Sequence, residues 1–279
     1  MYEVIFLIVL ALVWIVFASM QDLKSREVAN WLNFSLIIFA LGFRFFYSLF
    51  SRGDFVFFYQ GLIGLGIFFV IGNLLYYGRM FAGGDAKLMI AMGAVLPFSY
   101  SFLENLNIFL WFLLLFFFVG ALYGLIWSIW LAARNFEKFK KEFGKQFNKN
   151  KNRIYFPMAF GLVLMALGFV EAFAFYFGVL FFVLPYFYLF AKSVDEVCMV
   201  KKINASKLTE GDWLYEDVKV GKKLIKKSWG GLSKGDIRLI QKSKKQVVIR
   251  QGIPFVPVFL ISYVLLLGVW FLDLKYPLW

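Results

Sequence analysis

The sequence contains no histidine and only one cysteine, Cys198, among its 279 residues. Without histidine, every mechanism that uses an imidazole as a base or a metal ligand is excluded. One cysteine cannot form an intramolecular disulfide, and it cannot supply a Cys-x-x-Cys zinc site. We therefore expect neither a metal nor any other cofactor. Carboxylates become the leading candidates for catalytic chemistry.

Charged residues are scarce, and apolar residues dominate the chain. Hydrophobic residues make up 62% of the sequence, aromatic residues make up 22%, and the mean hydropathy is +0.74. Soluble domains are closer to half apolar. Here the apolar runs are continuous over about 20 residues, as membrane helices require, and do not alternate as in a β-barrel. The sequence predicts an all-α polytopic membrane protein with a small cytoplasmic α+β domain.

The apolar runs predict the topology. They lie at about 3–20, 31–50, 55–77, 87–103, 108–133, 154–170, 172–191 and 253–272. The first run lacks a basic segment and a cleavage site, so we expect a retained helix. With an outside N-terminus, all Lys and Arg except Arg44, Arg52 and Lys275 are cytoplasmic, as the positive-inside rule favours. We expect about eight transmembrane helices, or six if 154–191 is a re-entrant or surface hairpin around Glu171.

The same pattern divides the chain into five expected parts. They are the catalytic transmembrane helices 1–5 (1–133), a basic amphipathic cytoplasmic loop (134–153), a transmembrane hairpin (154–191), a small cytoplasmic domain (192–252), and the last transmembrane helix with its tail (253–279). The net charge of +13 then lies mainly in cytoplasmic loops. This distribution favours contact with anionic membrane lipids and not with nucleic acid.

The basic loop 134–153 carries eight Lys or Arg residues and two Glu residues. Its phenylalanines recur at spacings of three and four: Phe136, Phe139, Phe143 and Phe147. This spacing is one face of a helix. We expect a basic amphipathic helix on the inner leaflet, with its phenyl rings in the acyl boundary. A partly disordered charged loop is the alternative.

The polar segment 192–252 is the only sizeable part of the chain that could form a domain outside the membrane. Val197–Ile203 and Gln246–Ile249 are typical of short strands. Residues 232–240 can form a short helix with Ser233 as its N-cap. About 60 residues make a marginal domain, so we expect the membrane surface to support it.

Two aspartates lie beside apolar runs, where an ionised carboxylate is costly and usually functional. Asp22 follows the first run, in Gln-Asp-Leu-Lys-Ser-Arg-Glu (21–27), and Asp85 precedes the fourth, in Ala-Gly-Gly-Asp-Ala-Lys-Leu (82–88). The predicted topology places both at the cytoplasmic face. Two carboxylates held close together cannot both ionise easily, so the pair can supply both a base and an acid. Such a pair can activate a water for peptide hydrolysis.

Each aspartate also has a structural alternative. Asp22 can pair with a neighbouring cation at a helix end, and Asp85 can be an ordinary N-cap. Gly83 and Gly84 favour the functional interpretation, because glycine lets a substrate backbone approach without a Cβ in the way. Serine chemistry has no Gly-x-Ser-x-Gly context and no histidine base.

The residues around both aspartates resemble those of a known family. Asp22-Leu-Lys-Ser-Arg-Glu-Val-Ala-Asn-Trp31, followed about sixty residues later by Gly83-Gly84-Asp85-Ala-Lys-Leu88, is similar to the prepilin peptidases. The closest resemblance is to the archaeal preflagellin (archaellin) and prepilin signal peptidases. These are polytopic membrane aspartic proteases with a Gly-x-Gly-Asp motif. The first glycine of that motif is Ala82 here.

The resemblance implies that Asp22 and Asp85 are the catalytic pair. It also extends to Gly-Ile-Pro-Phe-Val-Pro (252–257), which is similar to the C-terminal region of archaeal members. Residues near the pair are candidates for substrate binding or support: Gly83, Gly84, Lys24, Arg26, Glu27 and Lys87. Glu27 can attract a basic leader or pair with a neighbouring cation. Lys24, Arg26 and Lys87 can tune the pair or bind phosphate headgroups.

The activity implied is that of a multi-pass cell-membrane endopeptidase of the archaellum or type IV pilus systems. It would remove short basic leader peptides from pilin-like or archaellin precursors at the cytoplasmic face. Bacterial relatives that also methylate the new N-terminus often carry a paired Cys-x-x-Cys domain. Because this chain has one cysteine, we expect no methyltransferase activity.

Three other functions remain open. A presenilin-like protease would cut within the bilayer, but Asp22 lies past its apolar run and no Pro-Ala-Leu follows in the C-terminal part. A transporter would use the aspartates as ion sites, but no inverted repeat is detectable and the spans hold few polar residues, Asn73 being the best candidate. A non-catalytic assembly scaffold would bind its partner through the polar domain.

Overall fold

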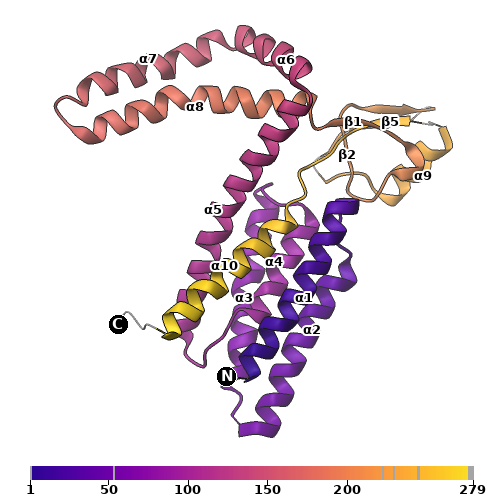
Figure 1. Cartoon of the computed structure of the whole chain (residues 1–279). Coiled ribbons are helices and arrows are strands. Elements are labelled where there is room, and N and C mark those ends of the chain that lie inside the picture. Colours follow the sequence, from indigo (N-terminus) through magenta and orange to yellow (C-terminus); the bar gives the residue numbers. More distant parts are fainter. Residues whose placement is uncertain (1, 53, 222, 229, 244–245, 276–279) are drawn as a thin grey trace. The chain divides into compact units, whose positions relative to one another are not determined.

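The computed structural model describes residues 2–52, 54–221, 223–228, 230–243 and 246–275, and Figure 1 shows their arrangement. The chain divides into two units, residues 1–124 with 253–279 and residues 125–252. The helices are α1 (Tyr2–Ser25), α2 (Asn30–Tyr47), the π-helical turn η1 (Ser48–Arg52), α3 (Val56–Tyr77), α4 (Gly83–Val95), α5 (Phe102–Arg134), α6 (Phe136–Lys149), α7 (Lys151–Leu167), α8 (Ala172–Val197), the 3₁₀ turn η2 (Ala205–Lys207), α9 (Lys234–Ser243) and α10 (Val256–Lys275). The strands are β1 (Val200–Asn204), β2 (Trp213–Leu214), β3 (Val218–Val220), β4 (Lys223–Ile225) and β5 (Gln246–Arg250).

The first unit is a helical bundle. Helix α1 packs against α2, α4 and α10, and α4 packs against α2 and α3, as Figure 1 shows. Fully buried aliphatic and aromatic side chains form the core, among them Leu7, Ile15, Leu36, Phe68 and Phe112. Large apolar side chains also cover the outward faces of the same helices. Helices that are apolar on all sides require an apolar surrounding.

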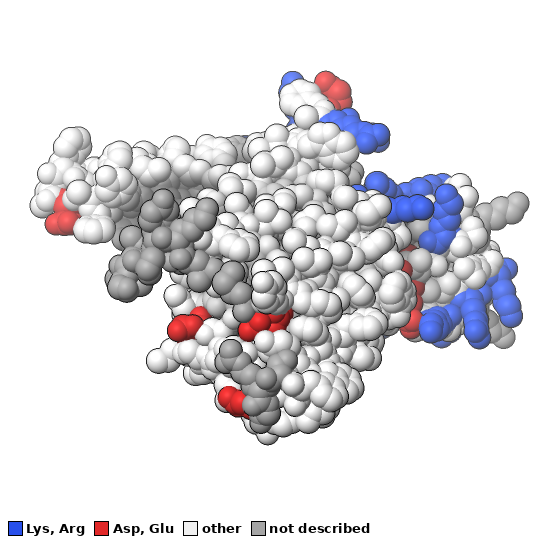
Figure 2. Space-filling view, turned by 60° about the horizontal axis from the view of Figure 1, so that its bottom comes forward, with Lys and Arg blue, Asp and Glu red and all other residues white. Residues whose placement is uncertain are grey.

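Within the described residues, five helices are long and apolar enough to cross a membrane. They are Tyr2–Ser25, Asn30–Phe50, Val56–Tyr77, Phe102–Arg134 and Ala172–Val197. A shorter apolar stretch follows at Val256–Leu272. On the face drawn in Figure 2, wide uncharged areas separate the charged side chains. The prediction of a mostly helical, multi-pass membrane protein with a small α+β region is therefore confirmed. Whether the chain crosses eight or six times stays a prediction.

The fourth apolar run is the main departure from the expected spans. The sequence predicts one span over 87–103, whereas α4 has 13 residues and ends at Val95. A helix of that length is about 20 Å long, and the hydrocarbon core is about 30 Å thick. The helical series of backbone hydrogen bonds ends here because Pro97 has no N–H to donate to a carbonyl oxygen one turn earlier. The following residues, Leu96 to Phe98, are buried and irregular.

The second unit contains the hairpin that was expected at 154–191. Helices α7 and α8 lie side by side in Figure 1 and are joined by a turn at residues 168–171, as the position of Glu171 predicts. They approach closely where two glycines meet, since a Cβ on Gly161 would lie 2.7 Å from the carbonyl oxygen of Gly178. Small residues that let backbones meet are typical of helix pairs in membranes.

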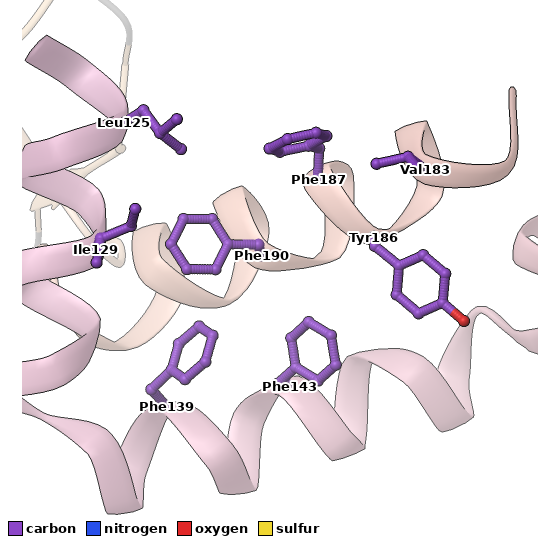
Figure 3. A pocket seen from close by; sticks show the side chains of 8 residues that line it. All are labelled: Leu125, Ile129, Phe139, Phe143, Val183, Tyr186, Phe187 and Phe190. Carbon is purple, nitrogen blue, oxygen red and sulfur yellow. The ribbon is translucent and has the colours of Figure 1, made fainter. Parts of the chain in front are cut away.

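The basic loop forms the helix α6, as predicted, but its phenyl rings also contact protein. The ring centroid of Phe139 lies 5.5 Å from that of Phe190 in α8. Figure 3 shows both rings beside Phe143 in an apolar recess of about 420 Å³. The recess is lined by Leu125, Ile129, Phe139, Phe143, Val183, Tyr186, Phe187 and Phe190.

The second unit also contains the small α+β region. An antiparallel sheet has the strand order β1-β5-β2, and β3 pairs with β4. Strand β5 fits the prediction for Gln246–Ile249, and β1 begins at Val200, three residues later than expected. One apolar cluster joins the sheets to α9: Ala205, Leu208, Leu214, Ile225, Leu232, Ile237, Ile240, Val247 and Ile249.

Ser233 caps α9, as the sequence predicts. Its hydroxyl accepts the Asp236 N–H at 3.2 Å and donates to Asp236 Oδ2 at 2.7 Å. The Ser233 hydroxyl, together with Lys223, holds the pKa of Asp236 below its ordinary value. This reciprocal pair satisfies one of the unpaired N–H groups at the helix start.

Ser233→Ala should therefore weaken α9 in the full-length protein by about 1 kcal/mol. Hydrogen exchange of the α9 amides should become about fivefold faster than in the parent protein at neutral pH. Because the folded pKa of Asp236 is depressed, its contribution is present above the unfolded pKa and is lost as the pH falls through the folded value. The difference between variant and parent should shrink below about pH 3.8. Ser243→Ala, at the other end of α9, is the control and should change exchange by less than twofold.

Candidate active site

Asp22 lies in the last turn of α1 and is 6% exposed. Its Oδ2 accepts a hydrogen bond of 2.9 Å from the N–H of Val256, the first residue of α10. The first N–H groups of a helix have no partner within the helix, and they carry the positive end of its dipole. The chain therefore places this carboxylate at the N-terminus of another helix, 234 residues away in sequence.

Asp85 lies in the first turn of α4 and is half-buried. Helices α1 and α4 are in contact, and the Asp22 carboxylate acts electrostatically on the Asp85 carboxyl group. The structure thus brings the two predicted aspartates into one cluster. Each carboxylate is associated with a helix N-terminus, α10 for Asp22 and α4 for Asp85. Electrostatic coupling of two carboxyl groups is the arrangement that lets a pair share one proton.

The loop between α1 and α2 forms one wall beside Asp85. Arg26 ends α1 with a left-handed backbone (φ 62°), and its N–H donates to the Asp22 carbonyl oxygen at 2.8 Å. This is an αL helix cap formed by a residue other than glycine. The Ala29 N–H donates to Gln21 Oε1 at 3.1 Å and ties the loop back to α1. The loop is therefore held at both ends.

The backbone around Asp85 explains why alanine can replace the first motif glycine. Ala82 is the N-cap of α4 with φ −71° and ψ 162°, an extended conformation that any residue adopts. A Cβ on Gly83 would lie 3.9 Å from Tyr76, and one on Gly84 would lie 3.6 Å from the Val28 nitrogen. Both are ordinary contacts, so the fold does not require these glycines. Their effect is to leave the surface next to Asp85 without side chains.

The other predicted residues differ in their relation to the pair. Arg26 is half-buried and interacts electrostatically with Asp22. Lys24 and Glu27 are exposed on the adjacent surface. The Nζ of Lys87 donates to Asn30 Oδ1 at 2.7 Å, so its recorded contact is with the start of α2 and not with either aspartate.

Two residues near the pair are not evident from the sequence. Val256 supplies the N–H that binds Asp22, although the motif at 252–257 marks this region without indicating a bond. Tyr123, in the middle of α5, interacts electrostatically with Asp22 and Arg26. One tyrosine in a long aromatic run carries no signal that could single it out. Within the described ranges, no three carboxylate or thiol groups come together, and the expectation that no metal binds stays a prediction.

The sequence is similar to a known protein family and to several named proteins. Residues 9–129 match the sequence model of the type IV leader peptidase family. The chain is 32% identical over 136 residues to a preflagellin peptidase of Methanococcus voltae, covering 45% of this chain and 56% of that protein. It is 34% identical over 80 residues to a preflagellin peptidase of Methanocaldococcus jannaschii, covering 29% and 33%.

A further relative is named as a prepilin peptidase. It is the prepilin peptidase EppA of Methanothermobacter thermautotrophicus, 34% identical over 99 residues, which cover 34% of this chain and 26% of that protein. The matches thus span about half of the Methanococcus voltae relative and a smaller share of the others. No solved structure matches the chain. The resemblance inferred from the two aspartate motifs is confirmed.

Proposed function

We propose that this chain, whose residues 9–129 match the sequence model of the type IV leader peptidase family, is a membrane aspartic endopeptidase. Its substrates are pilin-like or archaellin precursors, from which it removes the short basic leader at the cytoplasmic membrane face. The observation that carries the proposal is the electrostatic cluster of Asp22 and Asp85 at the starts of α10 and α4. The names of the relatives, preflagellin and prepilin peptidase, support the substrate class.

The pair would act by sharing one proton. The ionised carboxylate takes a proton from a water, whose oxygen attacks the scissile carbonyl carbon, while the protonated carboxyl donates its proton to the carbonyl oxygen. Collapse of the tetrahedral intermediate breaks the C–N bond, and the leaving nitrogen receives the proton taken from the water. One hydroxyl of the intermediate returns its proton to the second carboxylate as the C=O bond forms, so the pair again holds one proton. The Val256 N–H orients Asp22 for this cycle. The step needs no metal, cofactor or methyl donor.

The surroundings of the pair fit a substrate with a basic leader and a following apolar helix. Gly83 and Gly84 leave room for an extended backbone beside Asp85. The exposed Glu27 can attract the basic leader. Under the predicted topology, the scissile bond lies at the inner border of the membrane. Lys24 and Arg26 there would bind headgroups or tune the pair.

We also propose that α6 binds anionic membrane lipids. Its sequence, Phe-Glu-Lys-Phe-Lys-Lys-Glu-Phe-Gly-Lys-Gln-Phe-Asn-Lys (136–149), combines one aromatic face with five lysines. Such a helix lies in the interface plane, with its charges toward headgroups. Depleting anionic lipid from vesicles that contain the protein should reduce labelling of α6 by interfacial probes.

The position of the cut tests the proposed function. Membranes containing the full chain are incubated with a precursor that has a basic leader, a small residue and a hydrophobic helix, and the product N-terminus is determined by mass spectrometry. We expect one cut directly before the hydrophobic helix, slowed when the leader lysines are changed to glutamate. Cuts inside the hydrophobic helix would support the presenilin-like alternative. An intact precursor would contradict the proposal and favour a transporter or a scaffold.

A further inference from the structure

Arg44 is the largest completely buried side chain in the first unit, with an exposure of 0%. It lies near the C-terminal end of α2, in a span that is otherwise almost wholly apolar. Burying a guanidinium is costly unless all its donors are used, and arginine keeps its charge in proteins. Its contacts should therefore show what the residue does.

Every recorded hydrogen bond of the guanidinium goes to a main-chain carbonyl oxygen. Nε donates to Ala94 at 3.0 Å, and one terminal nitrogen donates to both Val95 and Pro97. The other terminal nitrogen donates to Phe57 in α3 at 3.0 Å. Three of the four acceptors therefore belong to the end of α4 and the residues directly after it.

The C-terminal end of α4 has unpaired carbonyl groups and a negative dipole end, and Arg44 compensates for both. The last carbonyls of a helix have no partner within the helix and carry the negative end of its dipole. Because α4 is too short to cross, these carbonyls and the irregular segment after them are buried within the bundle. Irregular backbone at membrane depth is tolerated only where protein groups satisfy it. A planar cation with several donors satisfies the carbonyls and complements the dipole.

Helix α3 contains a slot for this side chain. A Cβ on Gly61 would lie 2.5 Å from Arg44 Cδ, so only glycine leaves room there. The guanidinium carbon lies 4.3 Å from the centroid of the Phe57 ring, a cation–π contact. At the other end of the same pair of helices, Lys87 of α4 binds Asn30 of α2. Helices α2 and α4 are therefore linked near both ends.

We propose that Arg44 is a positioning residue for Asp85: by holding the C-terminal end of α4, it fixes where the N-terminal end of that helix presents the carboxyl group. The inference rests on the proposed function, in which Asp85 is one of the two reacting groups. Without Arg44, the link between α2 and α4 described above would be reduced to the exposed Lys87–Asn30 hydrogen bond. A shift of α4 along its axis would then move Asp85 relative to Asp22.

The structure offers a direct measure of this position. An ideal Cβ on Gly84 lies 3.7 Å from the Cβ of Val28 in the α1–α2 loop, within the range of about 3.5–4.5 Å found in disulfides. In a Cys198→Ser background, Val28→Cys with Gly84→Cys should crosslink rapidly under mild oxidation in membranes. A gel shift with a maleimide mass tag reports the remaining thiols. This measurement does not depend on any peptidase activity.

Adding Arg44→Met should slow this crosslink at least tenfold, because no donor then holds the α4 carbonyls. Arg44→Lys has one nitrogen instead of three and should slow it at least threefold. The control Phe112→Leu opens a cavity against Phe68 and Phe116 in the same core. Phe112→Leu should lower stability but change the crosslinking rate less than twofold. If Arg44 had a merely structural role, Arg44→Met, Arg44→Lys and Phe112→Leu would all slow the crosslink to a similar extent.

In the chain with native Val28, Gly84 and Cys198, Arg44→Met should lower kcat at least tenfold and change KM less than threefold. If Arg44→Met crosslinked at the parental rate, the proposal would be wrong. If Arg44→Met does not fold, Arg44→Lys decides instead, and a parental crosslinking rate in that variant would overturn the proposal. Equal slowing by Phe112→Leu would also overturn it. If no precursor is cleaved even by the parent, the proposed function fails while the crosslinking result still decides the position of α4.

Discussion

Asp22→Asn and Asp85→Asn should each lower the rate of precursor cleavage by about a thousandfold or more. General acid–base catalysis contributes roughly 10²–10⁴-fold, and in a shared-proton pair each partner is needed for both halves of the cycle. Asparagine has nearly the same shape as aspartate but cannot take up or release the proton. Initial rates of leader removal, measured in membranes with matched amounts of each variant, test this expectation.

The Asp22→Asn variant should keep the hydrogen bond between residue 22 and the Val256 N–H, which links α1 to α10. The asparagine amide oxygen can accept the Val256 N–H just as the Asp22 carboxylate does, so the junction between α1 and α10 should persist. A loss of activity without a loss of folded protein then isolates the proton chemistry. If either asparagine variant cleaved at the parental rate, the shared-proton mechanism would be wrong.

Asp54→Asn is a matched control. Asp54 also lies at the start of a helix in the same unit. Its Oδ1 accepts a hydrogen bond of 2.9 Å from the N–H of Val56, the first residue of α3, just as Asp22 accepts one from the first residue of α10. It is exposed, and its side chain satisfies an N–H at the start of α3 from the residue before the N-cap. Asparagine caps equally well, so this variant should cleave within twofold of the parental rate. An equal loss in Asp54→Asn would point to helix capping and not to catalysis.

The sequence draws attention to Asp22 and Asp85 because each carboxylate is unusual in its own local context, and their catalytic role stays a prediction. A charge beside an apolar run is visible without knowledge of the fold. Ser233 was predictable for a similar reason, since a cap depends on residues three positions apart. Such local signals also located the apolar runs and the turn near Glu171.

The features that escaped prediction depend on distant parts of the chain. The bond from Val256 to Asp22 joins residues 234 positions apart. Arg44 looked like an outer-end charge because its carbonyl partners lie 50 or more residues away, at the end of α4. The early end of α4 was missed because 87–103 is apolar throughout its helical and irregular parts. Hydropathy describes how apolar the side chains of a segment are, and it does not show where a buried helix ends.

Gly64→Ala should have the largest effect of any single-methyl change in the first unit. The new Cβ would lie 2.3 Å from the carbonyl oxygen of Gly93, and in return a Cβ on Gly93 would lie 2.4 Å from the oxygen of Gly64. The atoms in the way are main-chain atoms in both helices, so no side-chain rotation can relieve the overlap. Helices α3 and α4 would have to separate by about an ångström, and overpacking of this kind costs about 1–3 kcal/mol.

The separation should also impair catalysis, because α4 carries Asp85. A displacement of about 1 Å in a reacting group can cost about 10²-fold in rate. We therefore expect Gly64→Ala to lower the thermal unfolding midpoint by several degrees and to slow cleavage by up to about a hundredfold. Both are measured on detergent-solubilised protein, by a thermal melt and by a precursor assay.

Gly66→Ala, two residues further along α3, supplies the matched comparison. A Cβ at Gly66 meets nothing within 4 Å, and alanine is favoured over glycine in a helix by about 0.5–1 kcal/mol. This variant should melt at or above the parental temperature and retain its activity. If Gly64→Ala behaved like Gly66→Ala, α3 and α4 would not be in backbone contact at Gly93. The placement of Asp85 beside Asp22 would then lose one of the packing contacts that hold α4 in the bundle.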